Sequence, residues 1–226
     1  MRIVLTQSEG RLMGLQERLE TMGLEVLRHP LIQTQTLPAD LRPLSDCRWW
    51  LFSSVAAVRA VLELGADLRG RCLGAVGRAT QLALEEAGGR VDLVAPEETA
   101  ESLAEAFLAQ RPFGFVGLPQ GNRARPVLAR RLREAGYSVR SVVVYQTLPV
   151  PWPPELPVPE LVLLASPSGV EGLPERVGRG ARLLALGPTT AAALAERGFS
   201  YTLVPRPSVE AVVETIQHLR GETCPI

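Results

Sequence analysis

The chain contains no lysine, and all 24 of its basic residues are arginines. A phosphate-binding loop of the GxxxxGK[ST] type needs a lysine, so the segment LPQGNRAR at 118–125 is not such a loop and nucleotide hydrolysis is not expected. The arginines are balanced by 24 acidic residues, which leaves no net charge to attract nucleic acid or an anionic membrane. Any anion site must therefore be local, with arginine forks or backbone amides as donors.

Histidine and cysteine are also scarce. The two histidines, His29 and His218, and the three cysteines, Cys47, Cys72 and Cys224, form no CxxC pair and no His/Cys cluster. These spacings argue against a zinc motif and against a disulfide framework. Two isolated histidines also give little basis for a Ser/His/Asp or Cys/His catalytic set, so covalent catalysis is not favoured.

The sequence lacks the run of about 18 apolar residues that a membrane-spanning helix requires. Its opening, MRIVLTQSEGR, lacks the long apolar segment of a signal peptide and is predicted to begin with a strand. No GxGxxG follows that strand, so a dinucleotide cofactor has little support. We therefore expect a cytoplasmic protein that does not interact with membranes or nucleic acid.

What the chain does have is a regular alternation of β-rich runs and helical patterns, which predicts a parallel sheet covered by helices. The β-rich runs are RIVLT, LEVLR, WWLFSS, CLGAVG, VDLVAP, FGFVGLP, SVRSVVVY, ELVLLAS, RLLALG and YTLVP. Leucines at helical spacing are followed by Gly23 in one segment and by Gly136 in another. These glycines are expected to end the two helices.

The chain also repeats itself. LFSSVAAV at 51–58 matches LLASPSGV at 163–170, so Ser54 and Ser166 differ by 112 positions. A similar offset relates the segment around Gly23 to that around Gly136, and GRATQLALEEAG to GPTTAAALAERG. Two copies are too few for a solenoid, so the duplication predicts two α/β lobes with a cleft between them.

Two proline-bearing segments, 36–43 and 148–159, occupy equivalent places in the two copies. They are candidate connectors between the lobes. The residues alone leave open whether each copy folds contiguously or the N-terminal βαβ piece packs with the C-terminal half.

Candidate site residues follow from the rule that ligands of open parallel sheets bind beyond the carboxyl ends of the strands. Free N–H groups and the helix dipole favour anions there, by about 0.3–1 kcal/mol for a surface charge. The candidates are Ser53, Ser54, Ala56, Gly77, Arg78, Thr80, the segment from Pro119 to Arg125 with Asn122 and Arg123, Ser166, Pro167, Ser168, Gly187, Pro188, Thr189 and Thr190. The alternative is that the serines and threonines are only N-caps, with Pro167 and Pro188 as first-turn prolines.

Arg123, Arg125 and Tyr145 each have two interpretations. The arginines are either anion-binding groups at a loop and helix start or solvated surface charges. Tyr145 ends a β-rich run, VVVYQT, whereas its counterpart in the first copy is Ile32. That asymmetry indicates either a function gained by one copy or a core tyrosine with its hydroxyl satisfied.

Six elements in order make the chain similar to the uroporphyrinogen-III synthase family. They are FSS…AV at 52–58, VGRAT at 76–80 with Ala83 and Gly88, GNRAR at 121–125, VYQT at 144–147, SPSGV at 166–170 and LGPTTAAAL at 186–194. Each element is modest alone. Their order, the duplication and the coverage of nearly the whole chain make the resemblance specific.

The resemblance implies an α/β fold of two similar parallel-sheet lobes with helices on both faces, joined by a two-stranded connector and separated by a cleft. Residues 1–35 and 149–226 would form a discontinuous first lobe, and residues 36–148 the second. Hydroxymethylbilane would bind between them and be cyclised to uroporphyrinogen III, with loss of water and inversion of ring D through a spiro intermediate. The family uses no metal or organic cofactor, and we expect a monomer in transient contact with the preceding pathway enzyme.

The resemblance also suggests residue roles. The tyrosine of VYQT is the family's candidate acid, so Tyr145 would protonate or hydrogen-bond the departing hydroxyl. The side-chain carboxylates of the substrate would be held by Ser53, Ser54, Gly77, Arg78, Thr80, Asn122, Arg123, Arg125, Ser166, Ser168, Gly187, Thr189 and Thr190. The first copy departs from the family pattern at Ala56 and Gln81, and a role for Arg182 is left open.

A second hypothesis is a non-catalytic, two-lobed ligand-binding protein, because a fold does not define a function. Incubation with enzymatically generated hydroxymethylbilane and separation of the product isomers distinguishes the two. Binding without formation of the type III isomer would favour the ligand-binding protein.

Overall fold

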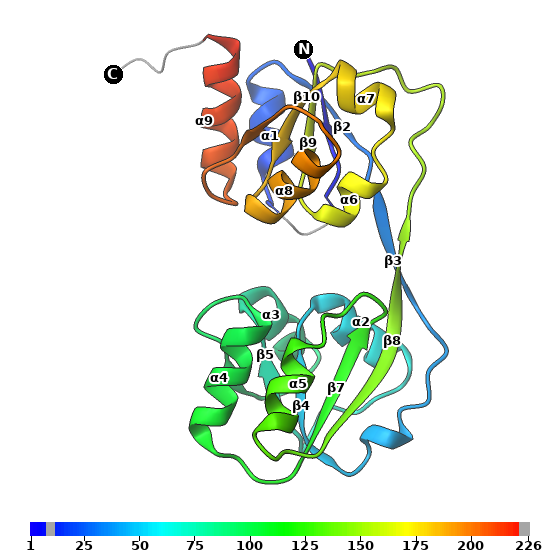
Figure 1. Ribbon diagram of the computed structural model, residues 1–226, viewed down its shortest axis with the longest axis vertical. Helices are drawn as coiled ribbons and strands as arrows, with labels where there is room; N and C mark the ends of the chain where they lie inside the picture. The colour runs from blue at the N-terminus through cyan, green and yellow to red at the C-terminus, as the bar shows by residue number, and fades with distance from the viewer. Residues whose placement is uncertain (8–11, 222–226) are drawn as a thin grey trace. The chain divides into compact units, whose positions relative to one another are not determined.

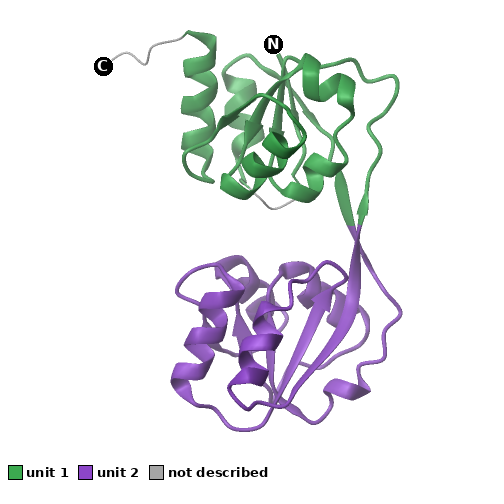
Figure 2. Cartoon of the chain, viewed as in Figure 1, with its two compact units in different colours: residues 1–33, 148–226 green, residues 34–147 purple. Residues whose placement is uncertain are grey.

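The structure is a computed structural model that describes residues 1–7 and 12–221 (Figure 1). It divides into two compact units, shown in different colours in Figure 2. Unit 1 comprises Met1–Gln33 and Leu148–Ile226, and unit 2 comprises Thr34–Thr147. The chain therefore enters and leaves unit 2 once, and unit 1 is assembled from both ends of the sequence.

Unit 1 is built on a five-stranded sheet with the order β11-β10-β9-β1-β2, and each neighbouring pair is parallel. Its strands are β1 (Arg2–Leu5), β2 (Glu25–Arg28), β9 (Leu161–Leu164), β10 (Arg182–Ala185) and β11 (Tyr201–Leu203). Its helices are α1 (Leu15–Thr21), α6 (Pro167–Glu171), α7 (Glu175–Gly180), α8 (Pro188–Glu196) and α9 (Val209–Arg220).

Helices cover both faces of this sheet. Successive side chains of a strand point to opposite faces, so a strand made only of apolar residues must be buried on both sides. On β1, Ile3 and Leu5 join α1 and α9 in one cluster of buried residues. The residue between them, Val4, joins α6, α7 and α8 in a second cluster. The short apolar runs of the sequence are therefore central strands that are buried on both sides.

Unit 2 is built on a six-stranded sheet with the order β3-β8-β7-β4-β5-β6. The neighbouring pairs β8–β7, β7–β4, β4–β5 and β5–β6 are parallel. Its strands are β3 (Ile32–Thr36), β4 (Cys47–Phe52), β5 (Cys72–Ala75), β6 (Val91–Val94), β7 (Phe115–Gly121) and β8 (Val139–Pro149). Its helices are α2 (Val55–Glu63), α3 (Arg78–Glu86), α4 (Ala100–Gln110), α5 (Val127–Glu134) and a 3₁₀ turn at Arg42–Leu44.

The core of unit 2 has the same two-sided plan. Trp50 and Phe52 of β4 pack with α2 and α3, whereas Trp49 and Leu51 pack with α4 and α5. The two units thus confirm the predicted α/β class, with parallel sheets and helices on both faces.

The strands β3 and β8 carry the chain between the units and pair with each other. Leu37 N–H donates to Val144 O (2.9 Å), and Val150 N–H donates to Leu31 O (2.9 Å). Their pairing forms a two-stranded connector.

The chain crosses between the units before each of the proline-bearing segments predicted to connect them. The crossings lie between Gln33 and Thr34 and between Thr147 and Leu148, so the two segments adjoin the crossings and contribute only their first residues, Leu37 and Val150 among them, to the connector. The rest of each segment leaves the ladder because proline has no N–H to donate to a strand partner.

The duplication explains the strand order. β9, β10 and β11 of unit 1 correspond to β4, β5 and β6 of unit 2, and β1 and β2 correspond to β7 and β8. Each sheet therefore combines strands from both sequence copies. In each sheet the chain order reverses between two neighbouring strands, β1 and β9 in unit 1 and β4 and β7 in unit 2. Ligands of open parallel sheets bind beyond the carboxyl ends of strands at such a reversal.

The predicted helix signals are confirmed at several helix ends. Gly23 and Gly136 follow the C-caps of α1 and α5 with φ angles of +75° and +87°. Pro167 and Pro188 begin α6 and α8. One expected loop begins later than predicted: β7 continues through Pro119 to Gly121, because β8 remains paired with it as far as Tyr145.

Candidate active site

Two of the predicted residues meet in unit 2 beyond the carboxyl end of β4. Tyr145 on β8 is half-buried, and its hydroxyl oxygen lies 3.1 Å from Ser54 Oγ. Ser54 precedes α2, and its Oγ accepts a hydrogen bond from Ala57 N–H (3.2 Å). Ser54 is therefore a helix N-cap, as the alternative interpretation held, and also the partner of the tyrosine hydroxyl.

Tyr145 also packs across a glycine of the neighbouring strand. Gly121 pairs with Tyr145 in the β7–β8 ladder, after a register shift between Gln120 and Gly121. A Cβ atom at position 121 would lie 2.5 Å from Tyr145 Cζ and 2.8 Å from its hydroxyl oxygen. The ring therefore lies directly against the backbone of Gly121.

Asn122 connects the end of β7 to β8 through two hydrogen bonds. Its N–H donates to Tyr145 O (3.0 Å), and its side-chain Oδ1 accepts from Thr147 N–H (3.0 Å). The Oδ1 atom therefore already accepts a hydrogen bond from the backbone of β8. The Asn122 side chain is exposed, and its NH₂ group can donate to solvent or a ligand.

The first turn of α3 already holds a carboxylate, which the chain itself supplies. Glu98 Oε1 accepts a hydrogen bond from Arg78 N–H (3.3 Å). Gly77, which precedes the helix, is extended with φ −174°, but a Cβ there would lie 2.5 Å from Glu98 Oε1. Gly77 therefore makes room for the Glu98 side chain, and its backbone does not require glycine. Thr80 is buried in the same turn.

A cavity of about 290 Å³ lies within unit 2 among the loops that follow β4, β6 and β7. Its polar lining includes Ser53, Glu98, Thr99, Arg123 and Arg125. Arg125 forms an ion pair with Glu101 (3.3 Å). The structure thus brings three predicted residues to one cavity, with two guanidinium groups that suit an anionic ligand.

Glu98 and Thr99 were not among the predicted residues. Thr99 is the N-cap of α4, and its hydroxyl accepts from Ser102 N–H (3.0 Å). The β-rich run VDLVAP is followed by a helix start in the overlapping segment PEETAESL. The rule that ligands bind beyond the carboxyl ends of parallel strands therefore applies to this loop as well, so the signal was present in the sequence.

In unit 1 the predicted residues lie beyond β9 and β10. Ser166 caps α6, with its Oγ accepting from Gly169 N–H (3.2 Å), and Ser168 is half-buried in the same turn. Gly187 precedes α8 with φ +114° and ψ 163°, a conformation open essentially only to glycine. In the first turn of α8, Thr189 is exposed and Thr190 is buried.

Thr6 and Gln7, beyond β1, were missed. Both side chains are 4% exposed, and Thr6 Oγ1 donates to Leu163 O (2.8 Å). They lie at the strand reversal of unit 1, which the sequence could not locate before the order of β1 and β9 was known. Residues 8–11, which come next in the sequence, lie outside the described residues.

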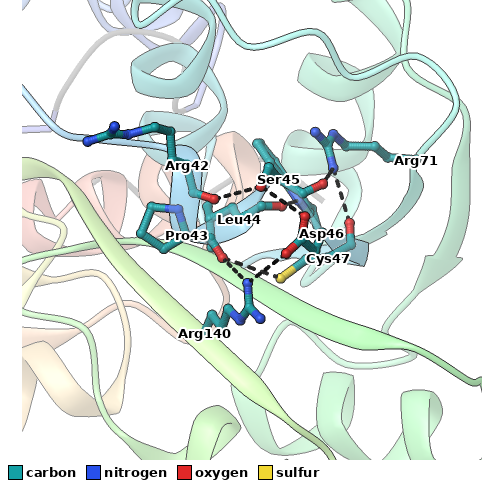
Figure 3. A network of polar contacts seen from close by, with 9 residues as sticks. Arg42, Pro43, Leu44, Ser45, Asp46, Cys47, Arg71 and Arg140 are labelled. Carbon is teal, nitrogen blue, oxygen red and sulfur yellow. Dashed lines mark hydrogen bonds and ion pairs between the residues drawn. The ribbon is translucent and has the colours of Figure 1, made fainter.

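Other arginines lie at the opposite edge of the sheets, where the parallel strands begin. Arg140 donates to Pro43 O (3.0 Å) and Arg71 donates to Cys47 O (3.1 Å), so both hold the segment that leads into β4 (Figure 3). Arg182, whose role was left open, begins β10 and donates to Leu219 O (3.1 Å), away from the strand ends of the site.

Cys47 lies in the same network at this edge. Burial is the main cause that raises the pKa of its thiol, with the Arg140 and Arg71 charges opposing it. A buried thiol that is kept protonated is a poor nucleophile.

Residues 1–7 and 12–221 provide neither a metal cluster nor a membrane span. No group of three or more His, Cys, Asp and Glu side chains in these ranges is arranged to hold a metal ion. No helix in the same ranges is both long and apolar enough to cross a bilayer.

Comparison with known proteins decides the family. Residues 14–218 match the family model described as uroporphyrinogen-III synthase HemD. The chain belongs to the uroporphyrinogen-III synthase family. A uroporphyrinogen-III synthase of Synechococcus elongatus is 27% identical over 64% of this chain and 60% of its own length. A Methanothermobacter thermautotrophicus protein with the same activity assigned provisionally is 28% identical over 91% of this chain and 93% of its own length.

Two solved structures share the fold of this uroporphyrinogen-III synthase family member. Uroporphyrinogen-III synthetase from Helicobacter pylori superposes with a TM-score of 0.73 at 20% identity, covering 97% of this chain and 100% of that chain. A mutant uroporphyrinogen III synthase from Thermus thermophilus gives a TM-score of 0.63 at 22% identity, covering 98% of this chain and 100% of that chain.

Proposed function

We propose that this protein is a uroporphyrinogen-III synthase, a cyclising lyase that converts hydroxymethylbilane to uroporphyrinogen III with loss of water and inversion of ring D. The single observation that carries the proposal is the family match over residues 14–218. The relatives and solved structures described above are named for the same activity, and none is a non-catalytic binding protein.

Tyr145 is the proposed acid. As the substrate hydroxyl leaves, its oxygen needs a proton or a strong hydrogen bond, so that water departs and the electron-poor carbon left behind can be attacked by a pyrrole. A phenol can donate that hydrogen bond, and Ser54 Oγ at 3.1 Å can support it by donating to the phenol oxygen. Both groups lie beyond the carboxyl end of β4, beside the strand reversal of unit 2.

The remaining residues are proposed to bind the carboxylates of the substrate. The chain has no net charge, so its affinity for a polyanion must come from local donors. The guanidinium groups of Arg123 and Arg125 line the cavity of unit 2, and the first turns of α2, α3 and α8 present backbone N–H groups. The proposed set is Ser53, Ser54, Gly77, Arg78, Thr80, Asn122, Arg123, Arg125, Ser166, Ser168, Gly187, Thr189 and Thr190.

We further propose a cytoplasmic monomer that receives its substrate through transient contact with the preceding pathway enzyme. The cysteines that the structure describes, Cys47 and Cys72, are free thiols, which suits a reducing compartment. Sedimentation of the purified protein, alone and with that enzyme, tests both the monomer and the contact.

The activity is tested by incubating the purified protein with hydroxymethylbilane that is generated enzymatically in the same vessel. Cyclisation without ring inversion gives the uninverted isomer, so separation of the products measures the enzyme against spontaneous closure. We expect predominantly the type III isomer. Binding of the substrate without an increase in type III product would overturn the proposal in favour of the non-catalytic alternative.

A further inference from the structure

Gly121 stands where any side chain would displace the Tyr145 ring. A Cβ at this position would lie 2.5 Å from Cζ, 2.7 Å from Cε2 and 2.8 Å from the hydroxyl oxygen of Tyr145. All three distances are far inside van der Waals contact, and the atoms concerned form the hydroxyl end of the ring. An added methyl group must therefore move the hydroxyl.

The backbone itself does not require glycine here. Gly121 is not among the glycines with positive φ, and it lies within β7 as a ladder partner of Tyr145. Its lack of a side chain is thus explained by the neighbouring ring. This differs from Gly187, where φ is +114° and the space a Cβ would occupy is empty.

Three contacts together determine where the tyrosine hydroxyl lies. Asn122 N–H holds the carbonyl of Tyr145 (3.0 Å), the backbone of Gly121 supports the ring, and Ser54 Oγ meets the hydroxyl (3.1 Å). Only the ring contact depends on the size of a neighbouring side chain. Residue 121 is therefore the position at which a small change redirects the phenol without altering the phenol itself.

The duplicated copy supports this coupling from sequence alone. The offset of 113 that relates Tyr145 to Ile32 also relates Gly121 to Ser8. The copy with the tyrosine has the glycine, and the other copy has neither.

We propose that Gly121 is a positioning residue for catalysis, whose missing side chain lets the Tyr145 ring lie against β7 with its hydroxyl next to Ser54. The inference rests on the proposed role of Tyr145 as the acid. It adds a residue that touches no reacting atom and acts only through the tyrosine.

The experiment is a double-mutant cycle of Gly121→Ala and Tyr145→Phe, measured as kcat and KM for type III formation. Gly121→Ala is expected to lower kcat by about as much as Tyr145→Phe, on the order of tenfold, with little change in KM. Adding Gly121→Ala to Tyr145→Phe is expected to cost little further kcat, because the hydroxyl that it displaces is already gone.

Gly117→Ala is the matched control, since Gly117 lies in the same strand and is also crowded. The three atoms nearest to a Cβ there belong to Trp50 and Cys47, with Trp50 Cδ1 at 3.1 Å and Cys47 Cβ at 3.2 Å, and none belongs to Tyr145. We expect it to lower the melting temperature while leaving kcat unchanged. The comparison separates strand crowding from misplacement of the phenol.

Different results overturn different claims. If Tyr145→Phe is slow but Gly121→Ala keeps the wild-type kcat, the positioning inference is wrong. The same holds if Gly121→Ala slows the Tyr145→Phe enzyme as much as it slows the wild type. If the wild-type protein forms no type III product, the proposed function fails instead. A crystal structure of Gly121→Ala then still tests the geometry, because an unchanged contact between the Tyr145 hydroxyl and Ser54 Oγ overturns the inference.

Discussion

Apart from the additional strand β3 in the sheet of unit 2, the two units share one strand order, but they use their equivalent helix starts differently. Gly187 in unit 1 has φ +114° and open space where a Cβ would be, whereas Gly77 in unit 2 is extended and lies against Glu98. When the two copies are aligned by the caps of α4 and α9, Thr99 and Ser208, the position that corresponds to Glu98 in unit 1 is Pro207. Duplicated glycines can therefore persist for different physical reasons, a strained backbone in one copy and room for a carboxylate in the other.

The units differ again at the proposed acid. Unit 2 presents Tyr145 beside Ser54, whereas the duplicated position is Ile32 and the counterpart of Ser54 is Ser166. Ser166 keeps the capping bond to Gly169 N–H but has no tyrosine hydroxyl to support. Unit 2 is therefore the candidate for proton transfer, and unit 1 for binding alone.

The largest expected effect comes from removing the Tyr145 hydroxyl. Tyr145→Phe is expected to lower kcat on the order of tenfold or more, since general acid catalysis contributes typically 10²–10⁴-fold and this leaving group is already labile. The melting temperature is expected to change little, because phenylalanine keeps the ring packing. The control is Tyr201→Phe, which removes an exposed phenol from β11 of unit 1 and is expected to leave kcat unchanged. Full activity of a folded Tyr145→Phe enzyme would remove Tyr145 from the mechanism.

Alanine at the two duplicated glycines tests their different roles. Gly187→Ala is expected to lower the free energy of unfolding by about 1–3 kcal/mol, because its φ and ψ are essentially restricted to glycine. Gly77→Ala meets no such backbone strain, and its smaller cost is expected to vanish when Glu98→Ala clears the space. Urea unfolding monitored by circular dichroism measures both. Equal costs that are insensitive to Glu98→Ala would contradict the distinction.

The paired caps Ser54 and Ser166 separate proton transfer from binding. Each alanine variant loses an N-cap, at a cost of about 1 kcal/mol in stability. Ser54→Ala is also expected to lower kcat severalfold, whereas Ser166→Ala is expected to raise KM about fivefold, the scale of one hydrogen bond. Ser208→Ala removes a cap of the same geometry from α9 and is the control for capping alone. Unchanged kinetics in both site variants would show that these serines are only caps.

The smallest effect is expected at Glu98. If the first turn of α3 binds a substrate carboxylate, Glu98 competes for the Arg78 N–H, and Glu98→Ala should lower KM by about two- to fivefold. Glu97→Ala removes the same charge one residue away and controls for a general electrostatic effect. An equal fall in KM for both variants would assign the change to charge, and a rise in KM for Glu98→Ala alone would make Glu98 part of the binding site.

Much of the fold was predictable because its signals are local. Short apolar runs identified the central strands, and Gly23, Gly136, Pro167 and Pro188 marked helix ends through their own backbone preferences. β3 was missed because IQTQT alternates with few apolar residues at an edge of its sheet, where burial leaves little pattern to detect.

The sequence by itself determined the family resemblance, the duplication and the capping residues, because each depends on residues close together in the chain or on comparison between its halves. Only the tertiary structure decided that Gly121 lies beneath Tyr145 and that Glu98 reaches the start of α3. Those contacts join segments whose proximity depends on the order and register of parallel strands. A shift of one residue in the β7–β8 register would turn Tyr145 to the other face of the sheet, away from Ser54, and no local signal specifies that register.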